Sequence, residues 1–136
     1  MPPGGVFWAD LQGAEHDPTT VQDCWQQCQS LYPHWDAPLL QDLAEELDMA
    51  QHRHKPLYML STGSRRKVGL IAALASGASV TLLDQPFSAL DQRSVLTIKA
   101  FLEEAAHAAT RAWIVADYEA PDDLPLTSVL NLSAAP

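Results

Sequence analysis

The sequence predicts an α/β fold with a helical lobe, from two features of its apolar pattern. In the second half, two short and almost wholly apolar runs, Val80–Asp84 and Ala112–Ala116, flank a stretch with apolar residues at helical spacing. Such runs are typical of strands buried on both faces, and strand–helix–strand order predicts a right-handed parallel crossover. In the first half, most apolar residues recur at helical spacing. The 136 residues suffice for one domain.

The first predicted elements are a short strand and a helix. Residues 5–9 are mostly apolar and predict the strand, and the next ten residues contain turn formers and predict a loop. Thr19 or Thr20 is a suitable N-cap for a helix that runs to about Leu31, because Tyr32-Pro33 follows there.

Two more helices are predicted before the apolar pattern changes. Pro38 fits the first turn of the second helix, since proline is tolerated where the backbone N–H has no intrahelical partner. The polar residues 52–56 predict a loop. The third helix is predicted to start between Ser61 and Gly63.

The second half is predicted to hold the sheet. After the strand Val80–Asp84, a helix is expected from about Arg93 to Ala109, and Ala112–Ala116 is expected as a second buried strand. Residues 128–132, Ser-Val-Leu-Asn-Leu, are interpreted as a third strand at the sheet edge.

The charge balance excludes several classes of protein. Eight lysines and arginines oppose 17 aspartates and glutamates, which gives a net charge of -9. A general nucleic-acid binder needs a basic face, so no nucleic acid is expected as a partner. The same acidity argues against a polybasic membrane-surface protein. No apolar run reaches the ~18 residues needed to cross a bilayer, and residues 1–5 do not read as a secretion signal.

Two pairs of potential metal ligands, one of cysteines and one of histidines, are not interpreted as metal sites. Cys24 and Cys28 are four residues apart in a predicted helix, where geometry disfavours a disulfide, and we expect reduced thiols. His52 and His54 lie in a predicted loop without a neighbouring cluster of ligands, so we expect them to be solvated.

The stretch from Leu60 to Asp91 carries the most chemical information. Ser61, Thr62 and Gly63 open a helix with a hydroxyl cap and a glycine, which can present backbone N–H groups to an anion such as phosphate, or serve only as an N-cap. Asp84 ends a predicted parallel strand, where a carboxylate can serve Mg²⁺ or simply form a turn. Residues 88–91 follow, and they equally fit the N-cap region of the next helix.

Taken together, these segments resemble the ATP-binding cassette (ABC) ATPases. Leu-Ser-Thr-Gly-Ser at residues 60–64, Leu-Leu-Asp-Gln-Pro-Phe at 82–87 and Ser-Ala-Leu-Asp at 88–91 resemble that family's signature loop, Walker B strand and D-loop. The resemblance implies a partial P-loop NTPase (RecA-like) parallel sheet with a helical ABC subdomain. It divides one partial ATPase domain, 1–136, into a signature subdomain at about 19–76 and a Walker B, D-loop and switch half at about 77–132.

The resemblance also implies roles for individual residues. Four residues would face a nucleotide held by the opposite subunit of a dimer: Ser61, Thr62, Gly63 and Ser64. Asp84 would hold Mg²⁺ through water, and Gln85 would stand where the family has its catalytic glutamate. Ser88 and Asp91 would communicate across the dimer, and Asp117 (or Tyr118) would occupy the place of the switch histidine. The cofactors implied are ATP and Mg²⁺.

The sequence departs from the family pattern at several positions. No Gly-x-x-x-x-Gly-Lys-Ser/Thr loop occurs among the 136 residues. Gln85 has no carboxylate with which to act as a general base, and Asp117 would repel a γ-phosphate. Thr62 replaces a glycine of the signature loop, Ser64 replaces its glutamine, and Trp8 stands near the position of the Q-loop glutamine.

We therefore predict the ATP-binding component of an ABC-type transporter, coupling ATP binding and hydrolysis to transport in the complete protein. This chain alone is not expected to hydrolyse ATP. The implied partners are a transporter membrane subunit and a second ATPase subunit, as a homo- or heterodimer, which implies a cytoplasmic location peripheral to the membrane. Trp25 and Trp35 are predicted to pack in the interior or, alternatively, to dock the membrane subunit. The alternative function is a degenerate, non-hydrolytic ABC-like interaction module.

Overall fold

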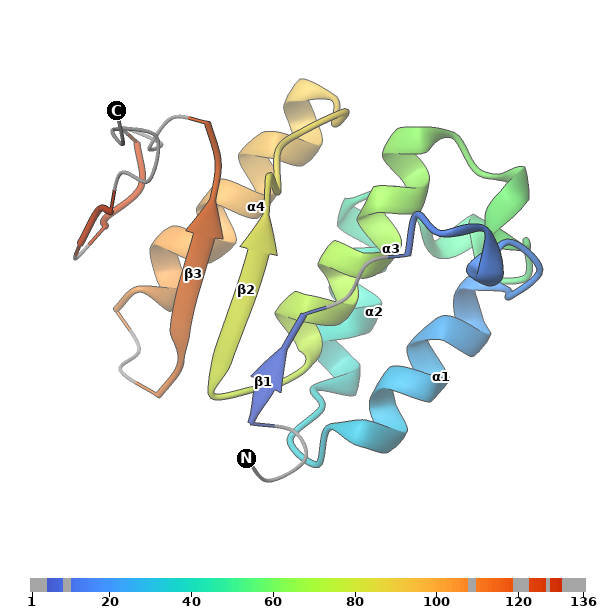
Figure 1. Cartoon of the computed structure of the whole chain (residues 1–136), viewed down its shortest axis with the longest axis horizontal. Helices are drawn as coiled ribbons and strands as arrows, with labels where there is room; N and C mark the ends of the chain where they lie inside the picture. Colours follow the sequence, from blue (N-terminus) through green and yellow to red (C-terminus); the bar gives the residue numbers. More distant parts are fainter. Residues whose placement is uncertain (1–4, 9–10, 108–109, 119–122, 127, 131–136) are drawn as a thin grey trace, which may run out of the picture.

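A computed structural model describes residues 5–8, 11–107, 110–118, 123–126 and 128–130. These residues form a three-stranded parallel sheet in the order β1–β2–β3 (Figure 1). The strands are β1 at Val6–Phe7, β2 at Val80–Asp84 and β3 at Ala112–Ala116. β2 and β3 pair along their full length, from Val80 opposite Ala112 to Asp84 opposite Ala116. The predicted α/β class and the parallel β2–β3 pair are confirmed.

Four α-helices accompany the sheet in the described chain: α1 (Val21–Leu31), α2 (Ala37–Glu46), α3 (Thr62–Ala75) and α4 (Gln92–Ala105). Short 3-10 turns occur at Ala14–His16, Ala50–His52 and Leu57–Met59. The predicted caps are confirmed. The Thr20 hydroxyl accepts a hydrogen bond from the N–H of Asp23, and the Ser61 hydroxyl accepts one from Ser64. No described helix is long and apolar enough to cross a membrane.

Among the described residues, helices cover only one face of the sheet. In Figure 1, α4 lies behind β2 and β3, while the near face of both strands carries no helix. Along β2, Thr81 and Leu83 are buried toward the helices. Along β3, Trp113 packs edge-on against Phe101 of α4, whereas Ile114 on the other face is 52% exposed. The prediction that these strands are buried on both faces is therefore wrong, because side chains that point away from the helices meet no second layer in the described chain.

Three predicted boundaries also need correction. The first strand covers Val6–Phe7 rather than 5–9, and Ala9 lies outside the described residues. α4 ends at Ala105 and a turn follows, so the described part of the predicted extension toward 109 is not helical. Residues 128–130 are not in a strand, while 131–132 of the same prediction lie outside the described residues.

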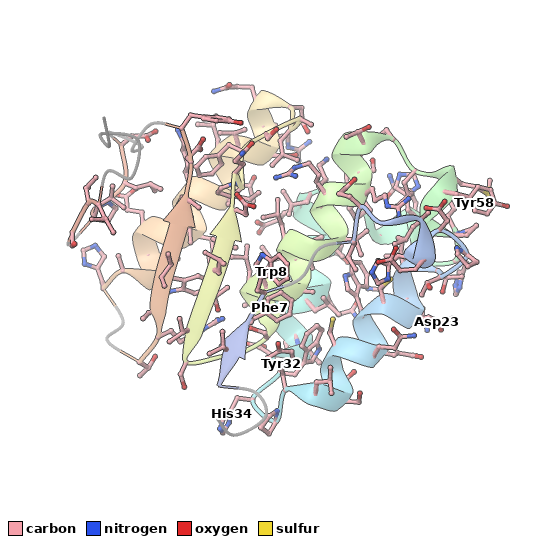
Figure 2. The ribbon with its side chains drawn as sticks, in the orientation of Figure 1. Phe7, Trp8, Asp23, Tyr32, His34 and Tyr58 are labelled. Atoms are coloured by element: carbon pink, nitrogen blue, oxygen red, sulfur yellow. The ribbon has the colours of Figure 1, made fainter. Side chains whose placement is uncertain are left out.

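The helical lobe is anchored to the sheet around β1. The phenol of Tyr32 donates to the carbonyl of Val6 at 3.0 Å, and its ring lies 5.1 Å from that of Phe7. Figure 2 shows Phe7 and Tyr32 side by side where α1 approaches β1. Gly77 connects α3 to β2 with φ 69°, and the carbonyl oxygen of His34 occupies the space that a Cβ would need there. Only glycine combines that φ with that approach at low cost.

Candidate functional site at the carboxyl edge of the sheet

The amino end of α3 forms one side of the candidate site. Ser61 has extended backbone angles and its hydroxyl receives the N–H of Ser64 at 3.1 Å, which closes the first turn of the helix. Ser61 and Thr62 are exposed, and Gly63 and Ser64 are half-buried. Within the described chain, the N–H groups of Thr62 and Gly63 form no hydrogen bond. The helix end can therefore offer these two donors to an anion.

Gly63 joins the helix end to the loop after β2. A Cβ at this position would lie 2.5 Å from the carbonyl oxygen of Ala89, so a larger residue would push the loop away. Ala89 itself has φ 61°, in the left-handed region. The glycine therefore lets the start of α3 pack against the backbone of residues 85–90, and this close contact brings two predicted motifs together.

Asp84 and Gln85 form the second side of the site. Asp84 is the last residue of β2 and its side chain is exposed, as the sequence predicts for a strand-end carboxylate. Gln85 has φ 46°, and its N–H donates to the carbonyl of Ala116 at 2.7 Å. Arg66 of α3 donates to the carbonyl oxygens of both Asp84 and Gln85. The guanidinium thus fastens the start of α3 to the end of β2.

Asp91 serves as the N-cap of α4. Its carboxylate accepts the N–H of Ser94 at 3.1 Å and the hydroxyl of Ser94 at 2.7 Å, and Lys67 lies 3.3 Å away. The hydrogen bonds from Ser94, followed by the contact with Lys67, hold the pKa of Asp91 well below its ordinary value. Ser88 is exposed, and its N–H donates to the carbonyl of Gln85 at 3.1 Å. The N-cap alternative for residues 88–91 is therefore confirmed for Asp91.

Asp117 lies at the same edge as Asp84. It directly follows β3, which is parallel to β2 and ends opposite Asp84. The carboxylate of Asp117 is exposed and accepts the N–H of Tyr118 at 2.7 Å. The carboxyl edge of the sheet therefore gathers Asp84, Gln85 and Asp117 next to the amino end of α3.

Two further cations beside Arg66 fix the site, and the sequence reasoning missed all three. Arg65 donates to the carbonyls of Leu11 and Gly13 and pairs with the Asp17 carboxylate at 2.7 Å. Lys67 donates to the carbonyl of Leu47 at 3.0 Å as well as contacting Asp91. Three adjacent cations in the first turns of a helix are unfavourable, because they oppose the helix dipole. Their presence there in the sequence could have indicated that they have specific partners.

The donor set fits a magnesium nucleotide only in part. The Asp84 carboxylate and the two N–H groups of α3 suit Mg²⁺ and phosphate, respectively. Among the described residues, however, no three histidine, cysteine, aspartate or glutamate side chains gather into a metal site. The described part of the site thus provides one carboxylate for Mg²⁺ and two N–H groups for phosphate, and it does not surround either ligand.

The remaining candidates have structural roles. Trp25 is 3% exposed and its indole N–H donates to the carbonyl of Val68 at 3.1 Å, which supports interior packing over docking. Trp35 is half-buried against the same interior. Cys24 and Cys28 are free thiols, and burial raises the pKa of Cys24 to about 11.

Comparisons with known proteins agree with the geometry. No protein-family profile matches the chain. An uncharacterized ABC transporter ATP-binding protein of Haemophilus influenzae is 47% identical over 49 residues, 36% of this chain and 20% of its own length. The cytochrome c biogenesis ATP-binding export protein CcmA of Nitrosomonas europaea is 30% identical over 98 residues, 72% of this chain and 46% of its own.

Solved structures show the same fold. A structure titled as the ATP-binding subunit of an ABC transporter superposes with a TM-score of 0.72 at 14% identity, covering 84% of this chain and 49% of that one. A putative cobalt transport ATP-binding protein superposes with a TM-score of 0.61 at 25% identity, covering 73% of this chain and 37% of that one. The chain thus spans about half the length, or less, of these similar proteins.

Proposed function

The chain is a relative of the ATP-binding proteins of ABC transporters and has part of their α/β fold, and on that premise we propose that it acts as part of a transporter ATPase. One observation supports this proposal above the others: Arg66 and Gly63 hold the amino end of α3 against the end of β2. That contact brings the N–H groups of Thr62 and Gly63 to the same edge as the Asp84 carboxylate, which supports a role for both in binding a magnesium nucleotide.

In this proposal, the site is completed by a second ATPase subunit, identical or different. Residues 61–64 face the phosphates of an ATP held by that subunit, through the N–H groups of Thr62 and Gly63. Asp84 serves the accompanying Mg²⁺ through water. Gln85 orients the attacking water with its amide, Asp117 borders the phosphate, and Ser88 with Asp91 transmits the state of one subunit to the other.

We further propose that the chain by itself does not hydrolyse ATP. Its 136 residues contain no glycine-rich loop with a lysine to cradle the phosphates, and an amide at residue 85 cannot accept a proton at ordinary pH. Residues 19–76 form the signature subdomain in this proposal and residues 77–132 form the Walker B, D-loop and switch half. A membrane subunit would hold the assembly at the cytoplasmic face of the membrane.

The test is MgATP-dependent association with a complete ATP-binding subunit from the same genome, measured by sedimentation. Thr62→Glu is expected to abolish the association, because a carboxylate at the exposed start of α3 repels the phosphates. Leu31→Glu, at a 60% exposed site on α1, is the matched control and should associate normally. Association that ignores MgATP would refute the proposal. Turnover by the isolated chain that Asp84→Ala abolishes would refute the lack of hydrolysis.

The second candidate is a degenerate interaction module that does not use nucleotide. Gln85, which replaces the catalytic glutamate, and Asp117, which adds a carboxylate at the edge, favour it. The same sedimentation experiment separates the two functions, since the module associates equally with and without MgATP and tolerates Thr62→Glu.

A further inference from the structure

Lys67 of α3 lies where three helices meet. Its ammonium group donates to the carbonyl oxygen of Leu47 at 3.0 Å and lies 3.3 Å from the carboxylate of Asp91. Leu47 is the C-cap residue of α2, and Asp91 is the N-cap residue of α4. The side chain of Lys67 is 12% exposed, so its stem is packed in the protein while its charged end has two partners. One ammonium group therefore joins α2, α3 and α4.

Both partners of Lys67 are negative. The last carbonyl groups of a helix have no intrahelical donor and form the negative end of its dipole. Asp91 carries a charge at neutral pH, because hydrogen bonds from Ser94 and the contact with Lys67 hold its pKa below the ordinary value. An ammonium group has three N–H donors and no acceptor, so it can bind a carbonyl and a carboxylate together. Without Lys67, these two negative groups would have no positive charge between them.

The two contacts of Lys67 strengthen each other. Ordering a long side chain costs conformational entropy, and the first contact to form has already ordered the stem for the second. Loss of the contact with Asp91 therefore weakens the contact with Leu47, and the reverse holds because coupling between two contacts is reciprocal. The end of α2 and the N-cap of α4 thus stabilise each other through one side chain.

α3 also touches the loop after β2 at other points, but those contacts end within the loop. Arg66 binds the main chain where the loop begins, and Gly63 lies against the carbonyl oxygen of Ala89. The contact of Lys67 with Asp91 instead continues to the C-cap of α2. The position of Asp91 therefore depends on the helical lobe as well as on α3.

We propose that Lys67 is a positioning residue that couples the carboxyl end of α2 to Asp91 at the carboxyl edge of the sheet. A displacement of the end of α2 then displaces the N-cap of α4, and the reverse. This coupling is a property of the chain by itself. Its use in communication between subunits rests on the proposed function, in which Ser88 and Asp91 transmit the state of one subunit to the other.

Amide hydrogen exchange of the nucleotide-free chain, followed by NMR, tests the coupling. The α2 reporters are the N–H groups of Asp48 and Met49, which donate to carbonyls of that helix, and the α4 reporter is the N–H of Ser94. The amides of α1 are the internal reference, because a general loss of stability speeds their exchange too. Lys67→Met keeps the apolar stem and removes the charge. It should speed exchange of all three reporters by ~3-fold or more relative to α1.

Asp91→Asn tests whether the effect is transmitted to α2. The side-chain oxygen of asparagine can still cap α4, but it carries no charge to hold Lys67. This substitution should speed exchange of the α2 reporters by ~3-fold, and should have no further effect on them in a chain that already carries Lys67→Met. Asp17→Asn is the matched control, because Asp17 pairs with Arg65 of the same helix. It should leave the α2 reporters unchanged, and circular dichroism should show all variants folded.

Three results would overturn the proposal. The first is that Asp91→Asn leaves the α2 reporters unchanged. The second is that Asp91→Asn speeds them equally with and without Lys67. The third is that the amides of α1 speed up as much as the reporters, which would show a general loss of stability. None of these measurements uses MgATP, so their failure is distinct from a failure of the MgATP-dependent association that tests the proposed function.

Discussion

Replacing Arg111 by methionine removes the cation that closes the carboxyl end of α3. The guanidinium donates hydrogen bonds of 2.8 to 3.2 Å to five acceptors: the carbonyls of Ala73, Leu74 and Ala78 and the hydroxyls of Ser76 and Thr81. It also lies 4.1 Å from the ring centre of Trp113. Methionine keeps most of the side-chain volume and removes the charge and all five hydrogen bonds.

The expected loss follows from these contacts. Hydrogen bonds to a charged group contribute ~1.5–3 kcal/mol each when measured singly, but bonds that share one donor group are not additive. A cation at a helix carboxyl end adds ~0.3–2 kcal/mol. Burial of the guanidinium opposes these gains and lowers the pKa of Arg111. We expect Arg111→Met to reduce the free energy of unfolding by ~3 kcal/mol, a large part of the ~5–15 kcal/mol of a typical domain.

Urea unfolding followed by far-ultraviolet circular dichroism measures this loss. Arg111→Lys should cost ~1.5 kcal/mol, because an ammonium keeps the charge at the helix end but cannot form the forked set of bonds. Arg93→Met, on the exposed side of α4, is the control and should unfold at nearly the original urea concentration. If Arg111→Met and Arg93→Met unfold at the same urea concentration, the role given to Arg111 is wrong.

Three further predictions follow from single residues. Cys24 should react with iodoacetamide at pH 8 far more slowly in the folded chain than in urea, because its thiol pKa is raised to about 11; equal rates would contradict its burial. Gly77→Ala should lower the free energy of unfolding by ~2–3 kcal/mol, since φ is 69° and the His34 carbonyl fills the Cβ position; an unchanged urea midpoint would contradict this. The pKa of Asp91 is lower in the folded chain than its ordinary value of 3.8. Its charge therefore stabilises the fold fully above pH 3.8, and this stabilisation is lost as the pH falls from 3.8 through the pKa of the folded chain. Asp91→Asn keeps the cap acceptor but not the charge, so its deficit in thermal stability should shrink below pH ~4; a deficit that stays constant would contradict the role of charge.

The elements with local signals could be predicted from the sequence. The bounds of β2 and β3 match the predicted apolar runs, and the caps at Thr20 and Ser61 lie where hydroxyl residues precede helical patterns. Caps and short apolar runs depend on neighbours within about four residues, so the sequence contains all the information they need. Ser61 at the start of a helix and Asp84 at the end of a strand also lie where the sequence predicts them.

The features that depend on distant contacts could not be predicted. An apolar run such as Ile114 and its neighbours indicates a strand, but only the arrangement of the helices decides which of its faces is covered. Arg111 reads as an ordinary surface cation, yet its partners lie 30 to 38 residues away in sequence. Residues 128–130 show the converse, because the sequence predicts a strand there but these residues pair with no strand of the sheet.

The three cations Arg65, Arg66 and Lys67 explain how a helix with a hydroxyl cap becomes part of a site. Arg65 and Lys67 each reach a carboxylate, Asp17 and Asp91 respectively, so their charges are largely balanced. Among the described residues, Arg66 donates only to the main-chain carbonyls of Asp84 and Gln85 and pairs with no carboxylate, so its positive charge adds to that of the helix end. An anion approaching Thr62 and Gly63 would thus meet one unbalanced cation beside two N–H groups. The same guanidinium holds Asp84 in place, so anion attraction and the alignment of the carboxylate depend on one side chain.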